Sequence, residues 1–560
     1  MLSEKEQLAD PGERWLEENL SALASRQPLL AALVRAAAAD PRIVPLAARN
    51  GRIVPGVHSA AGTVALHSLY DPRQESERLA GSLQGAGFLV VPGLGAGFHA
   101  AALLRHPDVR GLVIIEKSVE VLRSLFALVP LAPLLEDPRV TVCAGRASIR
   151  EGILAAWQPA VMGGMRTVPL RPWCEQEKAF FDAAAEEVQE AVEAVRRDYS
   201  VQSHFGKRWL TNILLNLPRA GSAPLDHARR ALAAVTAAGP SLEMQLPLLA
   251  AERDRVYLVA TDASLPALLR SGMRPDAVLS IDCQNHGYHH FLQGLPETTS
   301  LFLDLASPPL LARRPGTVVF VASAHPLVRY IASQWRQMVP IDTSGGNVTH
   351  AAVSLAIELG ARRVDVYGAD FSYPDGKPYA RGTYLYDLFW ADQSRVSPAE
   401  ARFFAFSQGS PQAHRTVVGT KVLYTTSLLS GYRERFLGLM GSTAAEILPV
   451  PGRGLDLPPQ KRRASPPIQS GGWNRSGRGG PGPGWKELLA GYARKVEQLP
   501  AFSTVSTGET KSIWGTILPV AARVVREGTD PGLQAVEEAR RWTLERIARV
   551  LQLEDPALRW

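Results

Sequence analysis

Apolar runs alternate with helical patterns through the middle of the chain, and this rhythm predicts an α/β fold. Helical or turn segments separate strand-like segments at 256–260, 275–282, 301–304, 318–321 and 363–370. Strands that alternate with helices in this way form doubly wound parallel sheets. We therefore interpret residues 234–382 as a nucleotide-binding α/β domain and expect the chemistry of the protein to lie there.

A second α/β unit is predicted in the N-terminal third. The apolar run 88–91 leads into a glycine-rich turn at 93–97, and a helix pattern separates this turn from a second run that ends at Glu116. This is the order of a dinucleotide or S-adenosylmethionine site, in which the acid accepts a hydrogen bond from a ribose hydroxyl. A βα unit that needs small residues only for packing has the same pattern. We treat Glu116 as structural.

The segments around the two α/β units are predicted to be mostly helical. Amphipathic helices are expected over 12–39, and two more, over 175–198 and 203–216, connect the units. Asn50-Gly51 lies between two β-type runs and predicts a hairpin.

The C-terminal part begins with a change in composition. A stretch rich in Pro, Gly, Ser and Arg predicts a linker, and helical patterns follow at 486–498, 511–526 and 532–552. The predicted fold class is α/β, with two Rossmann-like parallel-sheet units and a C-terminal helical bundle. The predicted domains are 1–200, 201–445, a linker over 446–485, and 486–560.

Charge and cysteine content exclude some classes of protein and leave others open. The net charge is +7, and a basic balance suits nucleic acid, a membrane surface or anionic substrates. A basic surface without a partner is an equal alternative, and we expect no nucleic acid. Cys143, Cys174 and Cys283 show no CxxC spacing, which argues against a zinc ribbon and suits a reducing compartment. With no signal-peptide pattern and no membrane span expected, we predict a cytoplasmic protein.

Polar residues follow several strands of the central domain, where ligands bind in open α/β sheets. Gly239, Pro240 and Ser241 open a helix, and a helix N-terminus suits a phosphate, although Ser241 is also a good N-cap. Other strands end in acids or small polar groups; these residues are Thr261, Asp262, Asp282, Asp304 and Asp370.

A second glycine turn opens an alanine-rich helix. It comprises Ser344, Gly345, Gly346 and Asn347, and its glycines let the backbone approach a ligand closely. Two tyrosines, Tyr373 and Tyr379, follow the strand that ends at Asp370, in a loop with Pro374, Gly376 and Pro378.

The order of these motifs carries a family resemblance. The segments AGPSL, PDAVLSID, SGGNVTHAAVSLAIELGARRVDVYGADFSY and YARG resemble the central domain of the motility-associated-factor (Maf) family, which glycosylates flagellin. The same order is similar to bacterial family-42 sialyltransferases. Asn50-Gly51, HSLYDP, the glycine-rich turn with Glu116 and FGKRWLTNILLNL also fit the Maf family.

The resemblance implies transfer of a nonulosonic acid, of the pseudaminic, legionaminic or sialic type, from its CMP ester to Ser or Thr of flagellin. The leaving group is a monophosphate, so a metal is not obligatory. The turns at 239–241 and 344–347 would hold the cytidine and phosphate, and Thr261, Asp262 and Asp370 would also bind the nucleotide sugar. Tyr373 and Tyr379 would donate to the leaving phosphate.

The chain departs from the sialyltransferase pattern in three places. Ala238 stands where those enzymes have Asn, and the aromatic residue lies at Tyr373 and not directly after Phe371. Their catalytic histidine has no clear counterpart. The base that takes the acceptor proton is therefore open, with His350, His414 and Asp282 as candidates.

Two other functions remain open from the sequence. Archaeal pterin diphosphokinases also resemble the central domain, and such an enzyme would need Mg²⁺ held by strand-end carboxylates. A non-catalytic factor that binds flagellin for flagellar assembly is the third hypothesis, and the loss of the Asn before Gly239 favours it.

Overall fold

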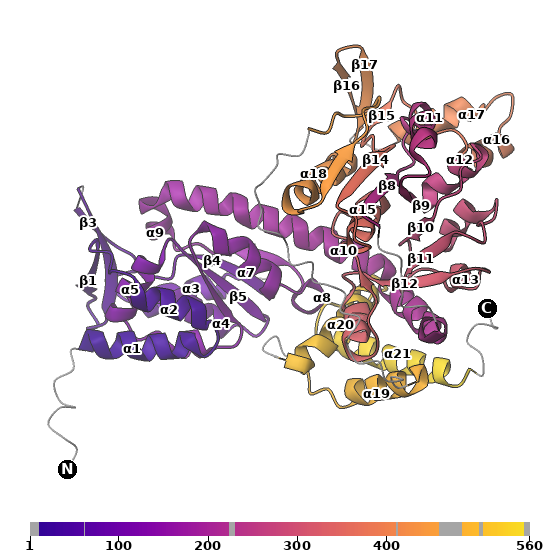
Figure 1. Ribbon diagram of the computed structural model, residues 1–560. Helices are drawn as coiled ribbons and strands as arrows, with labels where there is room; N and C mark the ends of the chain where they lie inside the picture. Colours follow the sequence, from indigo (N-terminus) through magenta and orange to yellow (C-terminus); the bar gives the residue numbers. More distant parts are fainter. Residues whose placement is uncertain are drawn as a thin grey trace. The chain divides into compact units, whose positions relative to one another are not determined.

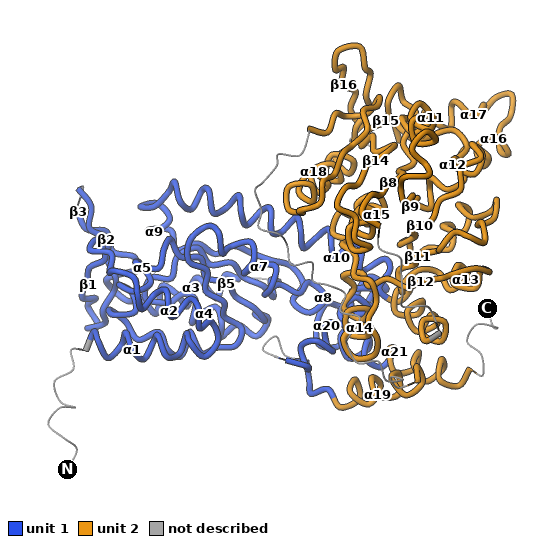
Figure 2. Tube along the Cα trace, in the orientation of Figure 1, with its two compact units in different colours: residues 1–206, 499–542 blue, residues 207–498, 543–560 orange. Residues whose placement is uncertain are grey.

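The computed structural model describes residues 11–60, 62–83, 85–222, 230–409, 413–458, 484–502 and 508–553. The chain forms two compact units, residues 1–206 with 499–542 and residues 207–498 with 543–560 (Figure 2). Each unit contains a parallel sheet with helices, so the predicted α/β fold class is confirmed (Figure 1).

The N-terminal unit holds two sheets. Strands β1 (Ile43–Ala47), β2 (Ile53–Ser59) and β3 (Gly62–Ala65) form an antiparallel sheet. The predicted hairpin at Asn50-Gly51 is confirmed, with Gly51 in the left-handed region at φ 77°. The second sheet is parallel, in the order β6-β5-β4-β7, and its strands are β4 (Phe88–Pro92), β5 (Gly111–Glu116), β6 (Val140–Ala144) and β7 (Met165–Thr167).

Helices surround these sheets in the N-terminal unit. They are α1 (Pro11–Ala24), α2 (Pro28–Ala36), α3 (Pro72–Gly81), α4 (Phe98–Leu104), α5 (Val119–Leu128), α6 (Ala132–Glu136), α7 (Ile149–Ala156), α8 (Pro159–Met162) and α9 (Arg171–Gln176).

One long helix replaces the two helices predicted over 175–198 and 203–216. Helix α10 (Lys178–Ser222) runs for 45 residues without a break. The predicted gap at 199–202 interrupts only the apolar period. It contains no glycine or proline that would stop a helix, so the hydrogen-bond ladder continues through it.

The second unit is built on eight parallel strands in the order β13-β12-β11-β10-β9-β8-β14-β18. The strands are β8 (Leu232–Thr236), β9 (Tyr257–Thr261), β10 (Ala277–Ser280), β11 (Ser300–Asp304), β12 (Val318–Ala322), β13 (Val339–Pro340), β14 (Arg363–Tyr367) and β18 (Glu446–Pro449). The chain moves outward from β8 to β13 and then returns to place β14 beside β8. This reversal makes the carboxyl ends of β8 and β14 the topological switch point, where open α/β sheets bind ligands.

Helix α15 (Val348–Glu358) carries the chain back across the sheet. Its Ala351, Ala352, Val353, Leu355 and Ala356 are buried in the core with the strands. Small side chains let the helix lie close to the sheet, which fixes the position of its N-terminal turn relative to the strand ends.

The remaining elements of this unit are helical, apart from a three-stranded antiparallel sheet. They are α11 (Leu242–Glu252), η3 (Asp262–Ser264), α12 (Leu265–Arg270), η4 (Asn285–Phe291), α13 (Pro309–Ala312), α14 (Pro326–Gln334), β15 (Tyr373–Pro374), α16 (Tyr384–Ala391), α17 (Ala399–Gln408), β16 (His414–Val418), β17 (Lys421–Thr425) and α18 (Ser427–Ser442).

The three helices predicted near the C-terminus are confirmed. They are α19 (Trp485–Glu497), α20 (Gly508–Arg526) and α21 (Leu533–Leu551). Helix α19 belongs to the second unit and α20 to the first. Helix α21 is divided, with its residues up to Trp542 in the first unit and the rest in the second. The predicted domain limits stay predictions, and most of the predicted linker, 459–483, lies outside the described residues.

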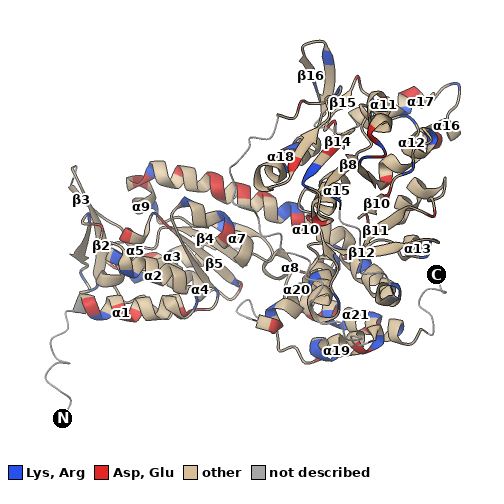
Figure 3. Ribbon diagram, viewed as in Figure 1, with Lys and Arg blue, Asp and Glu red and all other residues tan. Residues whose placement is uncertain are grey.

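Charged residues are distributed over both units, with acids repeated along α10 (Figure 3). None of the helices in the described ranges is long and apolar enough to cross a membrane.

Candidate functional site

Ser241 and Asp370 tie together the chain segments that leave β8 and β14. The Ser241 N–H donates to Asp370 Oδ2 at 2.8 Å, and its hydroxyl donates to Oδ1. Two further N–H groups reach this junction, from Gly454 to Asp370 Oδ1 at 3.1 Å and from Arg453 to Ser241 Oγ at 2.6 Å. Burial raises the pKa of Asp370, and these donors act against that rise. The Ser241 hydroxyl therefore holds the junction and does not cap α11.

Glycine is needed at this junction because two backbones meet there. The Gly239 N–H donates to the Gly368 carbonyl at 3.0 Å. A Cβ at Gly239 would lie 2.4 Å from that carbonyl oxygen and 2.4 Å from Asp370 Oδ2. The Gly-Pro-Ser pattern predicts space for a ligand at this turn. In the structure the Asp370 carboxylate and the Gly368 carbonyl fill that space. The N–H groups of Gly239 and Ser241 are both used inside the fold, and Pro240 between them has none to offer a phosphate.

Asp262 and Asp282 lie at the carboxyl ends of the neighbouring strands β9 and β10. Asp262 is buried and accepts from the Ser280 hydroxyl at 2.7 Å and from the Ala263 N–H at 2.8 Å. Burial raises its pKa, and the nearby Asp282 adds to the rise. Thr261, the residue before Asp262, bonds inside the protein through its hydroxyl to Ser264.

A histidine-rich segment outside the predicted site adjoins the two acids. Helix η4 carries His286, His289 and His290, and His286 Nε2 lies 3.7 Å from Asp282 Oδ2. The His290 ring is edge-on to Tyr384 at 4.6 Å between centroids, and His289 stacks on Tyr384 at 5.6 Å. The signal was present in the sequence as three histidines within five residues, directly after a strand that ends in an acid.

Tyr379 lies close enough to Asp262 for the carboxylate to act on its phenol, and Tyr373 lies close to Tyr379. Burial raises the pKa of Tyr379, and the charges of Tyr373, Tyr384 and Asp262 add to the rise. Burial raises the pKa of Tyr373 in the same direction. Both phenols therefore stay protonated at neutral pH and are available as hydrogen-bond donors. The loop is fixed to the first turn, since the N–H of Ala380 donates to Ala238 O at 2.8 Å.

The turn at 344–347 is connected to these tyrosines through α18. Arg435 Nε donates to Gly345 O at 3.0 Å, and its guanidinium lies over the ring of Tyr432. The Tyr432 side chain lies beside Gly346 and adds to the raised pKa of both Tyr373 and Tyr379. In this turn the N–H groups of Gly345 and Asn347 make no hydrogen bond to any described residue, and Asn347 caps α15 through its side chain.

His350 is buried beneath this turn. Its Nε2 lies 2.9 Å from Asp342 Oδ2, and its Nδ1 is buried without a partner in the described part of the chain. A Cβ on Gly345 would lie 2.2 Å from the His350 ring, so this glycine is required by the ring below it. Neither ring nitrogen is placed to meet an acceptor hydroxyl. His414 lies on the exposed strand β16, with Nε2 2.6 Å from the Thr425 hydroxyl.

Asp304, at the end of β11, is a buried acid with a pKa raised to about 6 by burial. It accepts from the Ala306 N–H at 2.9 Å. Asn212 on α10 donates to the carbonyls of Cys283 and Ala306, at 3.1 and 2.8 Å. The long helix thereby fixes the loops after β10 and β11.

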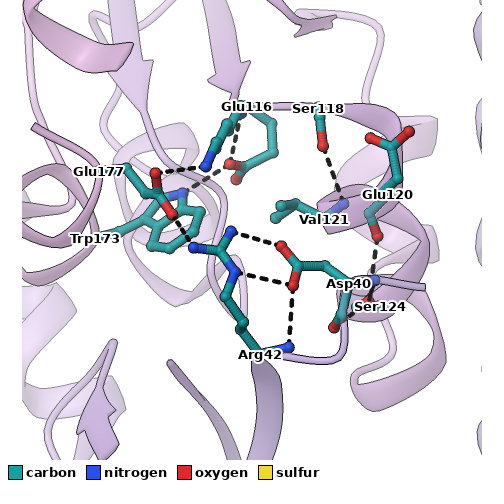
Figure 4. Close-up of polar contacts among 10 residues, drawn as sticks. Asp40, Arg42, Glu116, Ser118, Glu120, Val121, Ser124, Trp173 and Glu177 are labelled. Atoms are coloured by element: carbon teal, nitrogen blue, oxygen red, sulfur yellow. Dashed lines mark hydrogen bonds and ion pairs between the residues drawn. The ribbon is translucent and has the colours of Figure 1, made fainter. Parts of the chain in front are cut away.

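In the N-terminal unit Glu116, which would be the ribose ligand, is surrounded by protein donors, and Figure 4 shows its hydrogen bond from Trp173. Glu116, completely buried, accepts from Leu94 N–H at 3.0 Å, Lys117 N–H at 2.7 Å and Trp173 Nε1 at 2.7 Å. His67 Nε2 accepts from the Ala96 N–H at 2.9 Å. The carboxylate that would meet a ribose is bonded to the turn itself, in agreement with a structural Glu116.

The described residues contain no group of three or more His, Cys, Asp or Glu side chains placed to hold a metal ion.

Residues 208–376 match the family described as 6-hydroxymethylpterin diphosphokinase MptE-like. Two uncharacterized proteins of Treponema pallidum (strain Nichols) are similar to the chain. The first is 32% identical over 151 residues, which is 26% of this chain and 53% of the relative. The second is 34% identical over 148 residues, which is 25% of this chain and 69% of the relative. The chain therefore spans about half the length of the first relative.

The chain belongs to the same family as the second of these proteins. It is also similar to the solved structure of the MAf glycosyltransferase from Magnetospirillum magneticum AMB-1, with a TM-score of 0.56 and 15% identity over 96% of this chain and 91% of that one. The likeness shows the fold. The chain has the Maf fold with an MptE-like central domain, so the resemblance seen in the sequence is confirmed at the level of architecture.

Proposed function

We propose that the protein is a glycosyltransferase that moves a nonulosonic acid from its CMP ester to a Ser or Thr hydroxyl of flagellin, in support of flagellar assembly and motility. The observation that carries the proposal is that Tyr432 links the two parts of the site: it lies beside Gly346 of the turn at 344–347 and close enough to Tyr373 and Tyr379 to act on both protonated phenols. The likeness to the Maf glycosyltransferase supports it.

The chemistry of a CMP ester suits these groups. When the glycosidic bond breaks, negative charge develops on the phosphate, and neutral donors held in place stabilise that charge without reorganising. Tyr373 and Tyr379 supply phenol donors. The open N–H groups of Gly345 and Asn347, beside the N-terminus of α15, supply backbone donors of the kind that bind phosphates. Ser241 and Asp370 would act by holding the two segments in place.

The proposal puts this reaction in the cytoplasm. Cys143, Cys174 and Cys283 are all free, as a reducing compartment would keep them. No metal is required, because the leaving group is a monophosphate and the donors are phenols and N–H groups.

The test is incubation of the purified protein with flagellin and a panel of CMP-activated nonulosonic acids, followed by intact mass measurement of flagellin. An added mass equal to one or more sugar residues is the expected result. If CMP binds but flagellin stays unmodified with every donor, the catalytic proposal fails and a flagellin-binding assembly factor becomes the better account.

The match to the MptE-like family favours one competing function. A diphosphokinase would transfer a diphosphate from ATP to 6-hydroxymethylpterin in the presence of Mg²⁺. We expect no pterin diphosphate from this protein under those conditions. Its formation would replace the glycosyltransferase proposal.

A further inference from the structure

In the proposed reaction the tyrosines and the turn at 344–347 bind the leaving phosphate. No residue named so far accepts the proton of the acceptor hydroxyl. The three candidates from the sequence do not resolve this. His350 has one ring nitrogen against Asp342 and the other buried, and His414 lies against Thr425. Asp282 Oδ1 accepts from the Gln284 N–H at 2.9 Å, and Oδ2 faces His286 Nε2 at 3.7 Å. Another side chain at the strand ends is needed.

His290 is the side chain with the required surroundings. Its ring is held edge-on by Tyr384 at 4.6 Å, and it lies close enough to Asp262 and Asp282 for both carboxylates to act on its charge. Nδ1 is buried without a partner, and Nε2 makes no hydrogen bond to any residue in the described ranges. The ring is thus positioned by packing while Nε2 stays available.

We propose that His290 is the general base that accepts the proton of the acceptor hydroxyl, an inference that rests on the proposed function. The bond between the anomeric carbon and the phosphate oxygen breaks, and CMP leaves with the electron pair. The acceptor oxygen forms its bond to the anomeric carbon, and its proton passes to Nε2 of His290. Asp262 and Asp282 stabilise the imidazolium, which then releases the proton to water.

The electrostatics suit this role. Burial lowers the pKa of His290, and the two carboxylates oppose that effect, so the ring is neutral at neutral pH and can still take a proton. The titratable groups that act on it or pack against it come from the ends of β9 and β10, from η4 and from α16; they are Asp262, Asp282, His286, His289 and Tyr384.

The test compares His290→Gln with His58→Gln, the same change at an exposed position of β2 in the N-terminal unit. In the full-length protein, we expect His290→Gln to lower kcat for sugar transfer by about 10² to 10⁴-fold, the range of general-base catalysis. The Kd for CMP should remain within threefold of wild type. His58→Gln should transfer at a rate within threefold of wild type.

The pH profile separates a base from a structural residue. As the pH falls, kcat/KM of wild type should decrease with a single ionisation. The residual kcat/KM of His290→Gln should not show this decrease. Transfer by His290→Gln within threefold of wild type, or the same decrease in its kcat/KM as the pH falls, would overturn the assignment. If His290→Gln loses CMP binding, His290→Asn is measured in its place under the same criteria. An absence of transfer by wild type is a separate result, since it rejects the proposed function itself.

Discussion

Ser241 donates to both carboxylate oxygens of Asp370, although 129 positions separate the two residues in the chain. The pair joins the segments that follow β8 and β14, the two strands on either side of the switch point. Gly454 and Arg453 add N–H donors from a third segment. A buried network of hydrogen bonds therefore occupies the switch point of this sheet.

Asp370→Asn should destabilise the second unit by about 2 to 4 kcal/mol, because an amide NH₂ would face one of the donors that now meet a carboxylate oxygen. Chemical unfolding followed by circular dichroism measures the change. Asp375→Asn is the matched control. Asp375 is exposed and has φ 53°, a conformation that Asn tolerates, so we expect a change within about 0.5 kcal/mol. Equal effects of the two variants would contradict the junction.

Gly239→Ala should cost more than about 2 kcal/mol. The new methyl group would lie 2.4 Å from the Gly368 carbonyl oxygen, so one backbone would have to shift. Gly438→Ala lies in α18, where an added Cβ meets nothing within 4 Å. It should stabilise the unit by about 0.5 to 1 kcal/mol through helix propensity. Melting temperatures that move in the same direction for both variants would argue against this packing.

Glu116→Gln should destabilise the N-terminal unit by about 1 to 3 kcal/mol. The amide cannot accept from the Leu94 N–H, the Lys117 N–H and Trp173 Nε1 without turning its NH₂ toward at least one of them. Glu120→Gln, on the exposed side of α5, is the control and should leave the unfolding midpoint nearly unchanged. A stable Glu116→Gln would show that the turn does not depend on the carboxylate.

Acid should weaken the N-terminal unit through His67 and His99. Burial lowers the pKa of His67 to about 3 and that of His99 to about 4, both below the ordinary value of 6.5. Between pH 6.5 and 4 the unfolded chain binds more protons, so stability falls as the pH falls, by up to about 1.4 kcal/mol per pH unit for each histidine. Thermal unfolding from pH 7.5 to 4.5 should show a shallower decline in His99→Gln than in wild type. Parallel curves would contradict the prediction.

Tyr379→Phe should lower kcat for sugar transfer by about 10²-fold, since one donor to the leaving phosphate is lost while the ring still fills its place. Tyr70→Phe, an exposed tyrosine of the N-terminal unit, is the control and should transfer like wild type. Single-turnover mass measurements on flagellin give both rates. A Tyr379→Phe enzyme with full kcat would remove this phenol from the chemistry.

Local sequence patterns account for many elements of the fold. Apolar period, glycine and proline act over a few neighbouring residues, so the long buried strands, the Asn50-Gly51 hairpin and the C-terminal helices could be predicted, while the two- and three-residue strands β7, β13 and β15 could not. The same local reasoning divided α10 wrongly, because a lapse in apolar period does not stop a helix.

The partners of the polar residues follow from the tertiary fold. Ser241 looked like a phosphate ligand or a cap and instead holds Asp370, and Glu116 is bonded to the turn it follows. His290, absent from the predicted site, lies beside Asp262 and Asp282 because β9 and β10 are neighbours in the sheet. These pairings join residues far apart in the chain, and no local pattern fixes them, since they follow from strand order and from the packing of helices on the sheet.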